Sequence, residues 1–135
     1  MPILTGKILD VRATKKKDEQ MKGLNVNVAL EDFKPEADKA TIRYTYSLSY
    51  EPGVATMQVL GELIVQFPKD KMKECREKWE KEKNLPLDVA EEILTAITYT
   101  GTAVGTLLAF AIGVNAPINI PRAKLAPAAP TRPVQ

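Results

Sequence analysis

Residues 41–67 read TIRYTYSLSYEPGVATMQVLGELIVQF, and this stretch decides the fold. Apolar and polar residues alternate up to residue 50, which is typical of a half-buried strand. Pro52 and Gly53 then predict a type II turn, because proline fixes φ at the first corner and glycine supplies the positive φ of the second. The alternation resumes over residues 54–67. The stretch therefore predicts a long antiparallel hairpin with an apolar face that includes Tyr44, Tyr46 and Tyr50.

Two further strands are predicted before this hairpin. Residues 3–13 are rich in apolar and β-branched side chains and predict a strand, with a bulge at Gly6. Residues 24–31 alternate strictly and predict a second strand. We expect a hairpin loop over the polar residues 15–23 and another loop over residues 32–39. Consecutive strands joined by short links predict an antiparallel meander or Greek key.

Two helices are predicted after the strands. Residues 69–84 are mostly charged, and their apolar side chains fall on one narrow stripe, which predicts a solvated helix that touches the body along one edge: Met72, Cys75 and Trp79. A second helix is expected over residues 86–113, ending at Gly113 as a C-cap. Asp88 and Glu91 at its start resemble a capping box.

The second helix carries no charge over residues 93–114. Its length would permit a membrane span, and Gly101 and Gly105 form a G-x-x-x-G pair. Several threonines dilute the segment, however, so we favour a helix that is buried on nearly all sides. One small sheet covers only one side, and a second copy of the chain is the simplest cover for the rest. The predicted oligomer interface is Gly101, Gly105, Leu108 and Ile112.

Composition excludes several classes of function. The chain has 135 residues and a net charge of +2, without histidine and with one cysteine, Cys75. Catalytic sets built on histidine, zinc sites built on His and Cys, and disulfides within the chain are therefore excluded. The balanced charge argues against a nucleic-acid partner. Residues 1–8 lack the pattern of a signal peptide, so we expect a cytoplasmic protein that is not an enzyme and has no cofactor or metal.

Several residue groups admit a functional and a structural interpretation. Lys15–Lys17 could contact phosphate, Cys75 could be a reactive thiol, and Glu91 with Glu92 could act as acid–base groups. The three tyrosines of the hairpin could stack on single-stranded nucleic acid. In each case we favour the structural interpretation: a solvated loop, packing, interaction with the helix dipole, and core, respectively.

Leu60 and Ile64 are less easily assigned, because they lie on the face opposite the main apolar face of their strand. This second face either packs on the helices or contributes to an exposed apolar groove.

The order of these elements resembles the SecB-like export chaperones. The strand at residues 55–63 fits the fourth strand of that family, and residues 113–121, GVNAPINIP, fit the segment that follows its long helix. The resemblance covers about residues 3–121. It implies an α+β fold in which a four-stranded antiparallel sheet (residues 3–67) precedes a short charged helix and a long apolar helix. One domain is expected over residues 1–125, with a disordered Ala/Pro-rich tail at 126–135.

The resemblance also implies a function. Such proteins are ATP-independent holdases that form homodimers or homotetramers and bind unfolded or newly made polypeptides in apolar grooves. Relatives that guard a single client, such as an antitoxin, fit equally well. Together with the apolar second face described above, it predicts these client-binding residues: Leu60, Ile64, Ile118 and Ile120.

Two alternatives stay open. The chain could be a structural or assembly subunit whose apolar surface is permanently covered in an oligomer. It could also be a small membrane-anchored protein with a span at residues 93–114.

Overall fold

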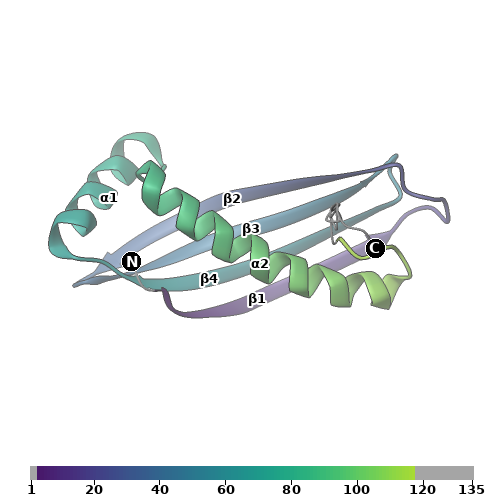
Figure 1. The fold of residues 1–135 in the computed structure, drawn as a ribbon, viewed down its shortest axis with the longest axis horizontal. Helices are drawn as coiled ribbons and strands as arrows, with labels where there is room; N and C mark the ends of the chain where they lie inside the picture. The colour runs from purple at the N-terminus through teal and green to yellow at the C-terminus, as the bar shows by residue number, and fades with distance from the viewer. Residues whose placement is uncertain (1–2, 118–135) are drawn as a thin grey trace, which may run out of the picture.

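The computed structural model describes residues 3–117 and shows one antiparallel sheet beneath two helices (Figure 1). The elements in chain order are β1 (Ile3–Lys15), β2 (Gly23–Glu36), β3 (Lys39–Glu51), β4 (Ala55–Gln66), α1 (Lys69–Glu82) and α2 (Leu87–Ile112). This confirms the predicted α+β class. The predicted tail at residues 126–135 lies outside the described residues.

The sheet has the strand order β1-β4-β3-β2, so β1 and β2 form its two edges. This is a Greek key, and the predicted hairpin between the first two strands is wrong. Residues 16–22 instead cross the end of the sheet from one edge to the other. The crossing is held to the β3–β4 turn, because Lys16 N–H donates to the Val54 carbonyl at 2.7 Å and Lys22 N–H to the Glu51 carbonyl at 2.8 Å.

The β3–β4 turn follows the prediction only in part. Gly53 has the expected positive φ, 63°, but the Glu51–Pro52 peptide bond is cis, unlike that of a type II turn.

β2 is longer than predicted, and the expected loop over residues 32–39 shrinks to a tight turn at Ala37 and Asp38. A bulge at Glu31 shifts the register, so that Phe33 pairs with Ile42 and is buried. Pro35 is tolerated because β2 is an edge strand.

The bulge predicted at Gly6 is also wrong. The register of β1 shifts instead at Leu4 and Leu9, and both side chains are exposed. Gly6 pairs regularly with Leu63, and a Cβ at Gly6 would lie 3.0 Å from Leu63 Cδ2.

The core lies between the sheet and the helices. The three hairpin tyrosines are at most 2 % exposed, which confirms their assignment to the core: Tyr44, Tyr46 and Tyr50. At the α1 end, Phe33 packs against Phe67 and Trp79, with ring centroids 6.5 and 6.0 Å apart. Met72, Cys75 and Trp79 are the buried residues of α1, as their stripe predicted.

Asp88, at the start of α2, forms an ion pair with α1 instead of capping its own helix. α2 begins after Pro86 without a side-chain cap, so the predicted capping box is wrong. Asp88 instead accepts a hydrogen bond from Lys71 of α1, with Nζ and Oδ2 2.9 Å apart. α2 ends where predicted, at Gly113, which has a φ of 73°.

α2 crosses the sheet diagonally, from the β2 side to the β1 side (Figure 1). It buries one side only: Val89, Ile93, Ile97, Gly101, Gly105 and Ala109. The prediction of burial on nearly all sides is therefore not met within a single chain. By length and composition α2 could cross a membrane, and 28 % of its most apolar window is buried in the domain.

Candidate functional site

The diagonal course of α2 leaves two opposite corners of the sheet uncovered on the helix side (Figure 1). One corner lies over the first half of β1, and the other over the first half of β2. Edge strands are the natural place for such openings, because one helix is too narrow to cover four strands. The first corner forms the candidate functional site.

A groove of about 860 Å³ runs between α2 and the start of β1. We call it the β1–α2 groove. β1 contributes Ile3 and Ile8, the sheet supplies Leu63, and α2 contributes Ala96 and Tyr99. Tyr99 is 81 % exposed and Ile8 is 39 % exposed, so both present apolar surface to solvent. A mainly apolar concave surface of this kind is the usual setting for ligand binding.

One wall of the groove is an unpaired sheet edge. β1 pairs only with β4, so every second backbone N–H and C=O of β1 points away from the sheet. An extended peptide could add to this edge through main-chain hydrogen bonds while its side chains enter the groove. Lys7 and Arg12 lie along β1, and charges of this kind discourage unwanted pairing of an edge strand.

The ionisable groups of the groove belong mainly to the first turns of α2. Glu91 and Glu92 line it there, whereas the amine of Lys7 reaches Glu62 at 3.9 Å. Burial raises the pKa of the Tyr44 hydroxyl on the groove floor, so this group stays protonated at neutral pH. These groups can favour a cationic ligand, but they do not form a nucleophile–base set.

Metal binding and thiol chemistry find no support in the described residues. Within residues 3–117, no group of three or more His, Cys, Asp or Glu side chains is placed to hold a metal ion. Cys75 is fully buried, and burial raises the pKa of its thiol to about 11. This supports packing rather than reactivity.

Two of the predicted client-binding residues, Leu60 and Ile64, lie on the sheet face that points away from both helices. Leu60 is opposite Thr45, and Ile64 is opposite Thr41, within a polar face. Both side chains are half-buried by their neighbours. The other two, Ile118 and Ile120, lie outside the described residues. The predicted groove between these two pairs of residues therefore stays a prediction.

Two residues of the predicted oligomer interface, Gly101 and Gly105, lie against the sheet of their own chain. Gly101 and Gly105 do mark a close approach, but it is to their own sheet. A Cβ at Gly101 would lie 2.6 Å from the Tyr46 ring, and one at Gly105 would lie 3.1 Å from Leu48 Cδ1. Both glycines are buried against their own sheet, and their part in an interface between chains stays a prediction. Leu108 and Ile112 are partly buried against the same core.

The sequence pattern did not identify the apolar residues that α2 turns to solvent: Leu87, Leu94, Tyr99, Leu107 and Phe110. It also missed the exposed residues of β1. A signal was present, because glycines at a four-residue spacing in line with Ile93 and Ile97 define the side that approaches the sheet. The remaining large residues of α2 must then face outward.

The four-stranded antiparallel sheet and the two helices define an α+β fold, which is similar to that of a SecB-like chaperone. One solved structure with this similarity is "Mycobacterium tuberculosis Rv1957 SecB-like chaperone in complex with a ChAD peptide from Rv1956 HigA1 antitoxin". It is similar to this chain with a TM-score of 0.56 and 12 % identity, over 85 % of this chain and 84 % of that chain. No protein-family model matches the sequence, and no curated protein does.

Proposed function

We propose that this protein is an ATP-independent chaperone that holds unfolded or newly made polypeptides in the β1–α2 groove. One observation carries the proposal: an open apolar groove lies beside an unpaired strand, in the fold of a chaperone that binds a peptide. Main-chain pairing with β1 would give affinity for any extended chain, and the groove would accept apolar side chains.

The outer side of α2 supports a proposal about assembly. Leu107 and Phe110 on the outer side of α2 are 69 % and 74 % exposed. Apolar side chains that are exposed together mark an interaction surface. We propose that a second copy covers them in a homodimer or homotetramer, that the protein is cytoplasmic, and that it needs neither nucleic acid nor a cofactor.

The membrane-anchored alternative draws on the length and apolar composition of α2. The seating of Gly101 against the Tyr46 ring favours a helix that belongs to the sheet. Withdrawing α2 into a bilayer would expose these tyrosines and remove the side of the helix that fits them. We therefore propose no membrane span.

The test compares two double variants. Ile8→Ser with Tyr99→Ser removes apolar surface from the groove, and Leu60→Ser with Ile64→Ser is the matched control on the opposite face. Burying one large apolar side chain contributes about 1.5–3 kcal/mol. The groove variant should therefore bind an unfolded client at least about tenfold more weakly, as measured by suppression of client aggregation.

The control variant should keep both its fold and its client affinity. The opposite ranking, with loss of binding only in the Leu60 and Ile64 variant, would move the client site to the polar face. If neither variant binds less but the groove variant changes the mass in solution, the groove is an interface, and the structural-subunit alternative is correct.

A further inference from the structure

A second concave surface lies between α1 and the turn that joins β2 to β3. It has a volume of about 570 Å³ and shares no lining residue with the β1–α2 groove. Phe67 N–H donates a hydrogen bond to the Asp38 carbonyl at 2.8 Å, which fixes the turn beside the start of α1. We call this surface the α1 cleft, and its lining residues are Ala37, Asp38, Lys69, Met72, Lys73 and Arg76.

Three of these residues are cations on one side of α1. Lys69, Lys73 and Arg76 follow one another at intervals of four and three residues, which places them on the same face of a helix. All three are exposed. With a rise of 1.5 Å per residue, they line about 10 Å of the helix, so one ligand can meet all three charges.

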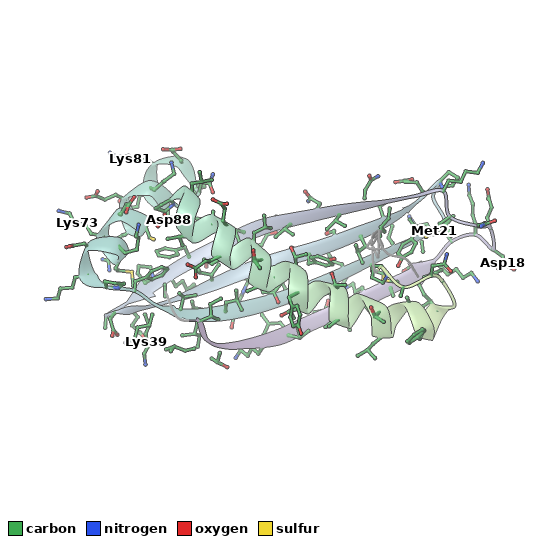
Figure 2. All side chains as sticks on the ribbon, viewed as in Figure 1. Asp18, Met21, Lys39, Lys73, Lys81 and Asp88 are labelled. Carbon is green, nitrogen blue, oxygen red and sulfur yellow. The ribbon has the colours of Figure 1, made fainter. Side chains whose placement is uncertain are left out.

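The charges on the two flanks of α1 are neutralised to different degrees. On the flank towards α2, Lys71 forms an ion pair with Asp88 at 2.9 Å and a second one within α1. Within residues 3–117, the three cations of the cleft form no ion pair. Figure 2 shows one of them, Lys73, on the side of α1 away from Asp88. Asp38 also lines the cleft, and its carboxylate accepts a hydrogen bond from Gln66 Nε2 at 2.8 Å. The cleft therefore keeps an excess of positive charge.

The floor of the cleft is apolar. Met72 is 5 % exposed and belongs to the core, and Ala37 lies opposite it in the turn. The aliphatic stems of the lysines border this floor, because such side chains cover apolar surface while their charged ends stay in water. Methionine adapts its shape to different apolar partners. A ligand that fits both parts of the cleft combines carboxylates for the rim with an apolar side chain for the floor.

We propose that the α1 cleft docks an acidic segment of a partner protein in which carboxylates flank an apolar side chain. Arg76 can hold one carboxylate through two parallel hydrogen bonds, and the two lysines can each donate to another. A nucleic acid would instead call for a longer track of cations and for aromatic side chains that stack on bases, and the cleft is lined by neither. Docking here does not depend on client binding in the β1–α2 groove.

Binding of a fluorescently labelled peptide of sequence GDLDEG to the full-length protein tests the proposal. Lys73→Gln with Arg76→Gln removes two cations from the cleft, and Lys78→Gln with Lys81→Gln removes the same charge from elsewhere on α1. None of the four side chains is buried, so both variants should keep the fold. Fluorescence anisotropy should show binding at least about tenfold weaker in the cleft variant and within about twofold of native in the control.

Two further peptides separate the charge of the ligand from its fit. The peptide GNLNQG lacks the carboxylates and should bind the native chain at least about tenfold more weakly than GDLDEG. The peptide GDSDEG keeps the charges but lacks the apolar side chain, and it should bind at least about threefold more weakly. Equal binding of GDSDEG and GDLDEG would mean attraction to surface charge without use of the floor, which overturns the proposal.

Three other results would also overturn it. The first is that the native chain does not bind GDLDEG. The second is an equal loss of affinity in both variants, which would reflect the net charge of α1 rather than the cleft. The third is that a single-stranded oligonucleotide or phosphatidylserine vesicles bind more tightly than the peptide and depend on Lys73 and Arg76, because the cleft would then be a phosphate site.

Discussion

Single residues explain why α2 can lie so close to the sheet. Gly101 sits over the ring of Tyr46, and a side chain there would have to displace an aromatic ring that is 2 % exposed. At Gly61 a Cβ would collide with the Tyr44 hydroxyl oxygen. Tyr46 thus needs a glycine opposite it on α2, and Tyr44 needs one beside it on β4. The contact between Gly101 and Tyr46 fixes where the helix crosses.

Gly101→Ala should destabilise the fold, although alanine favours helices. Overpacking of a tight contact costs about 1–3 kcal/mol, which exceeds the gain of about 1 kcal/mol from replacing glycine within a helix. The free energy of unfolding, measured by denaturant titration, should fall. Gly23→Ala is the control, since a Cβ at Gly23 meets nothing within 4 Å. A Gly101→Ala variant as stable as the native chain would mean that α2 does not rest on Tyr46.

At the scale of elements, the strands and helices could be predicted wherever their periodicity is regular. The β3–β4 hairpin and both helices were predicted, because alternation, a charged stretch with an apolar stripe and a C-cap glycine are local signals. The path between β1 and β2 was not, because a polar loop looks the same whether it closes a hairpin or crosses a sheet. The bulge at Glu31 hid the second half of β2, since it moves the apolar positions from even to odd numbers.

The candidate site was less predictable than the fold. Apolar residues surround α2 on all sides, so hydrophobicity alone does not distinguish the buried side from the outward side, and only the spacing of the glycines does. The groove at β1 depends on the diagonal crossing angle of α2, which follows from packing between residues far apart in sequence. Leu60 and Ile64 were selected from local alternation alone, and they lie on the face opposite the helices.

The contact between α1 and α2 should depend on pH through Asp88. The hydrogen bond from Lys71 lowers the pKa of the Asp88 carboxyl below its usual value. A carboxyl with a lowered pKa in the folded state stabilises that state above its unfolded pKa, and this contribution is lost as the pH falls through the folded value. Stability should therefore decline in acid partly through this pair.

Asp88→Asn tests this dependence. The variant should be less stable than the native chain at pH 7, and the difference should shrink towards pH 2, as measured by thermal unfolding. Glu77→Gln on the exposed side of α1 is a control that should change neither quantity much. A difference that is constant with pH would mean that the Asp88 charge does not hold the helices together.

At the scale of the molecule, both ends of the domain carry charged side chains. Figure 2 shows Lys39, Lys73 and Lys81 at the α1 end and Asp18 with Met21 at the opposite end. Exposed large apolar side chains lie on β1, β2 and α2. Apolar side chains that are exposed on these long elements leave surface available for contacts.

The protein should be a dimer or tetramer in solution without detergent. Leu107→Ser with Phe110→Ser should reduce its mass to that of the monomer, because these outward side chains would be the ones that a second copy buries. Light scattering after size exclusion measures this directly, with the Leu60 and Ile64 double variant as the control of native mass. A native chain that is already monomeric at high concentration would contradict the assembly proposal.

The Greek key order also determines when the sheet can form in full during folding. β2, β3 and β4 pair with strands that are adjacent in the chain. Ile3 of β1 instead pairs with Val65 of β4, so β1 cannot pair until β4 is available. During synthesis the first strand therefore leaves the ribosome early and stays without a partner until β4 has followed it. Closing this long loop costs entropy before any contact repays it. In the folded protein, β1 is the apolar edge strand that would bind clients. During folding, the same strand is exposed without a partner and must be kept from pairing with other chains.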